Sequence, residues 1–349
     1  MTVLGPVPPE ALGVMDAHSH LYIAAVPGGA ADAPVLTDVE GVGRELAGFR
    51  QLGGGAIVDC QPGGCGRDGR VLRTLSARTG VRVVAATGFH RRIYYPAVAP
   101  LFTMSAEAAA DYFLGEIRDG LEETRAAEPS PQPSPEGPGS AIVYPGIIKI
   151  AAEATLDACP LALFEAAAQV CRETGIAIEM HTERGAAVEE LLAFFGGRGV
   201  SPRRLVFCHV DKRPDFGLHR ELAQAGVLLE YDTFYRPKYA PERGVWPLLA
   251  RIAAAGLAGA VALATDMADP ALWAELGGGP GLAGIFTLIR SRLERLGLPD
   301  ETIRALLGGN IAGRIATQDE ISRKDAKTQR RQAQNSELGV FASLREISS

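Results

Sequence analysis

The chain has 349 residues, of which 47% are hydrophobic, and its formal net charge at pH 7 is −6. This composition can fill the core of one enzyme-sized domain, and the lack of a basic stripe argues against nucleic acid as the main partner. No apolar stretch is long enough to span a membrane and the N-terminus lacks the basic-then-apolar order of a secretory signal, so we expect a cytoplasmic protein.

Eight short apolar runs follow one another along the chain, and most are continuous Val, Ile, Leu and Ala rather than alternating. Such runs are typical of parallel strands that are covered on both faces. The predicted strands span residues 14–21, 55–59, 82–88, 146–150, 176–181, 204–209, 226–231 and 259–265.

Stretches with apolar residues at helical spacing, such as 161–171, lie between these runs. We expect Ser105 and Asp157 to be N-caps of two of the intervening helices. Gly175 and Gly196 are expected to end helices in the left-handed conformation. Eight alternations of strand and helix in about 250 to 300 residues predict an α/β fold, the (β/α)8 or TIM barrel, whose active sites lie at the C-terminal ends of the strands.

We assign residues 1–316 to this barrel and predict two segments of different character. Residues 126–140 are rich in Pro, Ser and Glu, and we interpret them as an insertion between the third helix and the fourth strand. Residues 317–349 are polar, and we interpret them as a solvated, disordered tail rather than an interaction arm, although residues 338–347 could dock elsewhere.

Polar residues stand at or near the ends of several predicted strands: His18, His20, Lys149, His181, His209 and Asp266. In a barrel these positions meet at one rim, and their nitrogen and oxygen atoms suit zinc and similar divalent ions. A His-x-His pair is also easily a packed or hydrogen-bonded feature, and a lone strand-end histidine is more often structural. Four of the six histidines at strand ends nevertheless favour the metal centre of a two-metal hydrolase.

Lys149 is costly to bury unless it is neutral, paired or modified. We expect burial to lower its pKa, which would make the neutral amine nucleophilic. Asp266 follows the last predicted strand, where an aspartate is often a helix N-cap. The neighbouring site residues favour a metal ligand or a proton carrier instead.

Cys208 and Asp211 lie close to His209 in the sequence. Because neighbours on a strand point to opposite faces, we expect Cys208 to be a core residue that faces away from the site. Asp211 could orient a ligand imidazole or lie on the surface, and the sequence leaves both interpretations open. The chain's five cysteines lack paired metal-finger spacing and suit a reduced compartment.

These motifs resemble the phosphotriesterase-like branch of the amidohydrolase superfamily, which includes phosphotriesterases and lactonases. The resemblance covers residues 10–316 and rests on Asp16-Ala-His-Ser-His20, Gly66-Arg-Asp68, Ala85-Ala-Thr-Gly88, Lys149-Ile-Ala151, His181-Thr182, His209-Val-Asp211, Thr265-Asp266 and Gly309-Asn-Ile-Ala-Gly-Arg314. It implies that Lys149 is carboxylated by carbon dioxide and bridges two divalent ions. By the same resemblance, the buried ion is held by His18, His20 and Asp266, and the more exposed ion by His181 and His209.

The mechanism that the resemblance implies is hydrolytic. Two ions share a bridging hydroxide of lowered pKa, and the exposed ion polarises the carbonyl or phosphoryl oxygen of the substrate. Asp266 is the catalytic residue, because it accepts the proton of the hydroxide as the attack proceeds. We expect Zn²⁺, although nitrogen and carboxylate sites also accept Mn²⁺ or Co²⁺.

Two loops at the predicted mouth carry candidate substrate contacts. After the seventh strand, Arg236, Lys238 and Tyr239 could bind a phosphate or carboxylate through charge-assisted hydrogen bonds. This loop resembles that of sugar lactonases acting on phosphorylated aldonolactones, but a solvated basic loop is an equally good interpretation. After the third strand, Tyr95 is a further candidate, although the aromatic rings there could instead pack the rim.

The sequence therefore predicts a metal-dependent lactonase for a small, anionic γ-lactone such as a phosphorylated sugar lactone. The main alternative is a phosphotriesterase, which a predominantly apolar leaving-group pocket would favour. A binding protein on an inactive barrel is a third interpretation, and the intact ligand set counts against it. A homodimer is compatible with the general frequency of symmetric dimers, although no patch in the sequence indicates one.

Overall fold

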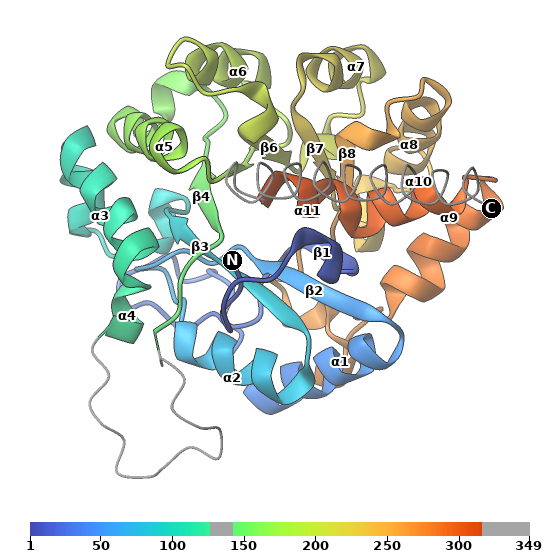
Figure 1. The fold of residues 1–349 in the computed structure, drawn as a ribbon, viewed down its shortest axis with the longest axis horizontal. Coiled ribbons are helices and arrows are strands. Elements are labelled where there is room, and N and C mark those ends of the chain that lie inside the picture. Colours follow the sequence, from blue (N-terminus) through green and yellow to red (C-terminus); the bar gives the residue numbers. More distant parts are fainter. Residues whose placement is uncertain (126–141, 316–349) are drawn as a thin grey trace, which may run out of the picture. The chain divides into compact units, whose positions relative to one another are not determined.

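The computed structural model describes residues 1–125 and 142–315, so the predicted insertion at 126–140 and the predicted tail at 317–349 lie outside the described residues. Eight parallel strands follow one another in sequence order around a barrel (Figure 1). The strands are β1 (Val14–Ser19), β2 (Gly54–Asp59), β3 (Arg82–Gly88), β4 (Ile147–Ala151), β5 (Ile178–His181), β6 (Leu205–Cys208), β7 (Leu228–Tyr231) and β8 (Val261–Leu263). The predicted barrel and its eight strands are confirmed.

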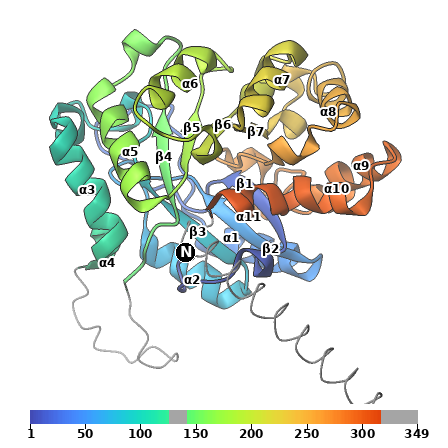
Figure 2. The same cartoon turned by 45° about the horizontal axis from the view of Figure 1, so that its top comes forward.

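Most helices connect the strands and lie outside them, as Figures 1 and 2 show from two directions, and three follow the last strand. They are α1 (Val39–Gln51), α2 (Gly69–Thr79), α3 (Ala106–Asp119), α4 (Glu122–Arg125), α5 (Leu161–Thr174), α6 (Val188–Gly196), α7 (Phe216–Ala225), α8 (Val245–Ala254), α9 (Ser291–Arg295), α10 (Asp300–Arg304) and α11 (Asn310–Ile315). Within the described ranges, no helix combines the length and the apolar character needed to cross a bilayer.

One of the two predicted N-caps is confirmed. The Ser105 hydroxyl accepts the N–H of Ala108 at 3.2 Å and begins α3. The prediction for Asp157 is wrong, because this residue lies in a short 3-10 turn and α5 begins only after Pro160. The residue before a proline is disfavoured in the helical region, which delays the start of the helix.

The two predicted helix-ending glycines also differ in outcome. Gly175 ends α5 in the left-handed conformation, with φ of 71°, as predicted. The prediction for Gly196 is wrong, since it is the last residue of α6 and the following Gly197 stays right-handed with φ of −62°. The chain turns left-handed only at Gly199, with φ of 75°.

The strand register places Gly88, Lys149 and Glu179 side by side on β3, β4 and β5. Gly88 has φ of 110°, and a Cβ atom there would lie 1.9 Å from the carbonyl oxygen of Lys149. Only glycine permits this approach. The Phe89 N–H then donates to the same carbonyl at 2.8 Å. The end of β3 thereby fixes the position of Lys149 along the barrel axis.

Asp16 joins the first strand to the segment after the last. Its Oδ1 accepts the backbone N–H of Thr265 at 2.9 Å, and its Oδ2 accepts the Thr265 hydroxyl. The Asp266 N–H also donates to the carbonyl of His18 at 2.8 Å. These bonds bring His18 and Asp266 together, and burial raises the pKa of Asp16 to about 7.

Helix α11 closes the end of the barrel opposite to the polar strand ends. Its residues Ile311, Ala312 and Ile315 belong to one buried apolar cluster with residues inside the barrel such as Met15 and Leu228. Figure 1 shows α11 lying across the barrel beside β1. The C-terminal ends of the strands are left to form a site.

Arg67, from the Gly66-Arg-Asp68 segment, ties the neighbouring helices to the barrel. Its guanidinium pairs with Glu116 on α3 and with Glu123 on α4, and the side chains of Arg67 and Glu116 are both 0% exposed. Arg67 Nη1 also donates to the carbonyl of Ala86 on β3 at 2.7 Å. A buried charge of this kind is tolerated because it has several partners.

Replacing Glu116 tests this network. Glu116→Ala deprives the buried Arg67 of its innermost partner, so we expect the free energy of unfolding to fall by about 3–5 kcal/mol. The control is Glu40→Ala, which removes the exposed partner of Arg78 and should leave stability nearly unchanged. Urea denaturation followed by circular dichroism measures both variants. An equal loss of unfolding free energy in the two variants would show that the buried network stabilises the fold no more than an exposed ion pair does.

Candidate metal centre

The predicted metal ligands from β1, β5, β6 and β8 come together at the C-terminal end of the barrel. The ring centroids of His18 and His20 are 5.4 Å apart, those of His18 and His209 are 5.1 Å apart, and those of His181 and His209 are 4.7 Å apart. Asp266 Oδ1 lies 3.9 Å from His18 Nε2 and 3.8 Å from His20 Nε2. Ligands of one tetrahedral zinc ion lie about 3.4 Å apart, so these atoms are close to the spacing of a shared ion.

Three of these histidines use Nδ1 to bind a buried oxygen, which leaves the lone pair of Nε2 free for an ion. The pairs are His18 with Glu230 at 2.7 Å, His20 with Gln61 at 2.8 Å, and His209 with Asp232 at 2.6 Å. Burial lowers the pKa of all three histidines, to about 4 for His20. They are therefore neutral at pH 7, which is the form that binds metal ions.

His181 is more exposed than the other three, at 15% of its side chain. Its Nε2 is nevertheless a buried nitrogen that has no hydrogen-bond partner among the described residues, the nearest acid being Glu183 at 3.7 Å. Burial lowers the pKa of His181 as well. An unsatisfied buried nitrogen costs free energy unless a ligand binds it, which suits a metal-binding position.

Asp266 lies in the left-handed region, with φ of 48°. Burial opposes ionisation of its carboxyl group, but the Arg236 guanidinium, 3.0 Å from Oδ2, holds the pKa below its usual value. Asp266 is therefore a carboxylate, and its Oδ1 faces the Nε2 atoms of His18 and His20.

Lys149 lies in the centre of the barrel and is fully buried. Its Nζ is 3.3 Å from Glu179 Oε1, 3.4 Å from Cys208 Sγ and 3.5 Å from His18 Nε2. The expectation of a lowered pKa is wrong. Burial by itself lowers the pKa of Lys149, but the charges of Cys208, Cys60 and Glu179 around it raise that pKa well above its usual value.

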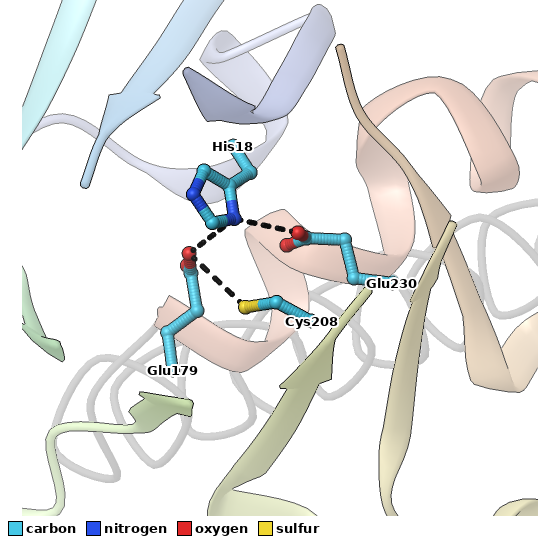
Figure 3. Close-up of side chains that lie close together, drawn as sticks. All are labelled: His18, Glu179, Cys208 and Glu230. Carbon is cyan, nitrogen blue, oxygen red and sulfur yellow. Dashed lines mark hydrogen bonds and ion pairs between the residues drawn. The ribbon is translucent and has the colours of Figure 1, made fainter. Parts of the chain in front are cut away.

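Figure 3 shows the His18 ring between Glu179 and Glu230, with Cys208 beside Glu179. These four side chains could be taken for a metal site of their own. The 2.7 Å between His18 Nδ1 and Glu230 Oε1 is instead a hydrogen-bond length, shorter than the separation of two ligands on one ion. We interpret the group as a support that orients His18.

Cys208 does not face away from the site, so that prediction is wrong. Its Sγ lies 3.4 Å from Lys149 Nζ and 3.7 Å from Glu179 Oε1. Strand β6 ends at Cys208, and His209 adopts a left-handed conformation with φ of 64°. The alternation of strand faces stops there, which lets Cys208 and His209 both point inward.

Asp211 is buried, so the surface interpretation is wrong. Its Oδ2 accepts the backbone N–H groups of Asp232 at 3.1 Å and Thr233 at 2.9 Å. Asp232 in turn binds the ring and the backbone N–H of His209. Asp211 therefore acts on the histidine indirectly, by fixing Asp232.

A cavity of about 380 Å³ opens above the ligands. Its floor includes His18, His20, His181, His209 and Asp266. The segment between β1 and α1 forms a wall of small and apolar residues, which are Ile23, Ala24, Ala25, Val26, Gly29, Ala30, Ala31, Ala33, Pro34 and Val35. Polar groups enter the remaining lining through Gln61, His90, Tyr94 and Lys212.

The four predicted substrate contacts are not among the residues that line this cavity. Arg236 donates to the carbonyl groups of Asp232 and Thr265 and pairs with Asp266. Lys238 is exposed, and its Nζ lies 5.2 Å from the ring centroid of Tyr239. Their contact with substrate stays a prediction.

Tyr95 is buried, at 3% exposure, and its hydroxyl has two protein partners. It accepts the N–H of His90 at 3.0 Å and donates to the carbonyl of Gly63 at 3.1 Å. Its substrate contact also stays a prediction, while these bonds show that it anchors the segment after β3.

Sequence reasoning missed several groups that support or extend the site, which are Gln61, His90, Glu179, Lys212, Glu230 and Asp232. The sequence pattern could have identified two of them. Glu179 lies two residues before His181 on one strand, and Glu230 interrupts the apolar run of β7. An acid inside a buried strand needs a partner, and this alone marks both as candidates.

Comparisons with known proteins agree with this geometry. The sequence model described as the Phosphotriesterase family matches residues 1–128 and 135–312. A phospho-furanose lactonase of Mycoplasmopsis agalactiae is 30% identical over 248 residues, covering 69% of this chain and 68% of the relative. An N-acetyltaurine hydrolase of Rattus norvegicus is 27% identical over 265 residues, covering 67% and 71%. A lactonase from Listeria monocytogenes shares the fold, with a TM-score of 0.79 at 21% identity, covering 91% of this chain and 98% of that one.

Replacing Glu230 tests the support of His18. Glu230→Leu removes the acceptor of His18 Nδ1, so we expect the affinity for Zn²⁺ to fall by about 10- to 100-fold. Glu230→Gln keeps an acceptor oxygen and should change the affinity by a smaller factor. Competition titration with a chromogenic chelator measures both, and equal affinities of Glu230→Leu and the wild type would show that His18 needs no such orientation.

Proposed function

Because the chain belongs to the Phosphotriesterase family, and is thus a hydrolase, we propose that it is a metal-dependent lactonase for a small, anionic γ-lactone. The observation that carries this proposal is the meeting of neutral histidine nitrogens and one ionised carboxylate on the floor of a cavity that also contains Lys212. The lactonase names of the relatives in Mycoplasmopsis agalactiae and Listeria monocytogenes support it.

The donor atoms fit two divalent ions. In the proposed centre His18, His20 and Asp266 would hold one ion, His181 and His209 the other, and a carboxylated Lys149 would bridge them. Imidazole nitrogens and carboxylates suit Zn²⁺, and also Mn²⁺ or Co²⁺. When bound, the ions would lower the pKa of a water molecule and polarise the carbonyl oxygen of the lactone.

Asp266 would act as the proton acceptor in the proposed reaction. Arg236 keeps its carboxyl group ionised, and its Oδ1 faces the ligand nitrogens where the attacking water must lie. A carboxylate in this position can take the proton of the water as the acyl carbon is attacked. The proton can then reach the alkoxide that leaves when the lactone ring opens.

Lys212 would recognise the anionic group of the substrate. It lines the cavity, and its Nζ lies 5.3 Å from the ring centroid of Tyr239, which also contacts Lys238. Two ammonium groups therefore lie near one aromatic ring, that of Lys212 in the cavity lining and that of Lys238 outside it. A phosphate or carboxylate on the lactone would be attracted there, with Arg236, Tyr95 and Tyr239 as further candidate contacts.

A phosphotriesterase is the second candidate, and the wall between β1 and α1 favours it. The ten residues that this segment contributes to the cavity are small or apolar. Such a wall could hold the apolar leaving group of an aryl phosphotriester. The ammonium group of Lys212, in the cavity lining, favours an anionic substrate instead.

Turnover on matched substrates separates these candidates. We expect kcat/KM of the metal-loaded protein to be highest for a phosphorylated γ-lactone, lower for its unphosphorylated counterpart, and lowest for an aryl phosphotriester and for N-acetyltaurine. Asp266→Asn should lower kcat/KM by at least about 100-fold, because the proton acceptor is lost. A preference for the phosphotriester would replace the lactonase proposal with its rival.

The same panel tests the anion site. Lys212→Met should lower kcat/KM for the phosphorylated lactone by about 10-fold or more while changing that for the unphosphorylated lactone less. An equal fall in kcat/KM for both lactones would mean that Lys212 does not bind the anionic group.

Replacing Lys149 tests the proposed bridge. Lys149→Ala removes the only carbamate-forming group among the predicted ligands, so we expect the bound metal, measured by mass spectrometry of the dialysed protein, to fall from two ions to one or none. The exposed Lys238→Ala is the control and should retain two. Full metal content in Lys149→Ala would refute the bridge even if activity changed.

A further inference from the structure

His90 lies within the cavity and has no role in the site described so far. It follows β3, is 9% exposed and is part of the cavity lining. Its ring centroid is 5.5 Å from that of His181 and 6.4 Å from that of His20. A molecule bound against those two histidines therefore lies within reach of His90.

The backbone fixes the proton of the His90 ring. The N–H of Arg91 donates to His90 Nδ1 at 2.7 Å, so Nδ1 must present a lone pair. The neutral ring then carries its proton on Nε2. Within residues 1–125 and 142–315 the His90 ring makes no hydrogen bond besides this one, and the Tyr94 ring packs edge-to-face against it at 4.8 Å between centroids. The result is an N–H donor without a hydrogen-bond acceptor, on a residue that lines the cavity.

This arrangement is the reverse of that of the predicted metal ligands. In His18, His20 and His209 the Nδ1 atom faces an oxygen acceptor, which leaves a lone pair on Nε2. A histidine can ligate an ion through Nε2 only when Nε2 has no proton. The backbone N–H of Arg91 therefore suits His90 to hydrogen-bond donation and not to metal binding.

The His90 segment is held in place from two sides. The Tyr95 hydroxyl accepts the backbone N–H of His90, as described above. The side chain of Arg91 pairs with Glu153 at 3.0 Å and with Glu183 at 2.9 Å, which ties the segment after β3 to those after β4 and β5. A donor that is fixed before the substrate binds loses little freedom on binding, which strengthens recognition.

We propose that the Nε2–H group of His90 donates a hydrogen bond to an oxygen atom of the bound substrate. The inference rests on the proposed function, in which that oxygen belongs to the lactone. His90 is then a substrate-binding residue of the reaction that is distinct from the metal ligands and from the proton acceptor Asp266.

Two variants of the metal-loaded full chain test the donor. His90→Leu has no donor, and we expect kcat/KM for the preferred lactone to fall by about 10- to 100-fold. His90→Gln keeps an N–H donor of similar reach and should recover to within about threefold of the wild type. Both variants should retain two metal ions.

Nitrogen-15 NMR of the histidine rings gives a readout that does not depend on activity. The spectrum of the wild type should contain a Nε2-protonated ring signal that disappears in His90→Gln. This measurement remains decisive if His90→Leu does not fold.

The inference is overturned by any of three results. These are a Nδ1-protonated His90, a loss of one metal ion in both variants, or an unchanged kcat/KM in His90→Leu. If the wild type cleaves the phosphotriester or N-acetyltaurine but no lactone, the lactonase proposal fails by itself, and the same comparison of variants on the cleaved substrate still tests His90.

Discussion

The centre of the barrel is organised by the need to give every buried charge a partner. Lys149 has no access to water, and the strand register places Glu179 beside it on β5. Glu230 and Glu179 both contact Nδ1 of His18, at 2.7 Å and 3.4 Å (Figure 3). Because an unpaired charge in such a place costs several kcal/mol, these contacts set the orientation of the first histidine, and the remaining ligands are arranged around it.

The parts of the molecule that the sequence predicted depend on pattern and topology. Continuous apolar runs indicated the strands, and a parallel barrel brings the C-terminal ends of its strands together, so His18, His181 and His209 could be expected near one another. The partners that orient them could not be predicted. Glu230 lies on β7 and Gln61 follows β2, and the choice of partner depends on how the strands align, which periodicity does not encode.

The errors have both local and long-range causes. The inward position of Cys208 follows from the left-handed backbone of His209, and no residue type in that segment signals such a turn. The pKa of Lys149 was misjudged because its acidic neighbours are distant in sequence. The predicted substrate contacts stay predictions: Arg236 points to Asp266 and the carbonyl groups beside it, while Lys212 lines the cavity. Loop side chains take positions that only the assembled barrel determines.

His209 and Asp266 share a backbone feature with a consequence for engineering. Both lie in the left-handed region, with φ of 64° and 48°, where a residue other than glycine lowers the stability of the folded state by about 1 kcal/mol. Selection for heat tolerance alone would favour glycine or asparagine at both positions, and each such change would remove a proposed metal ligand. Stabilising mutations should therefore leave His209 and Asp266 unchanged. They are better placed in the outer helices, where a gain in stability does not remove a residue of the site.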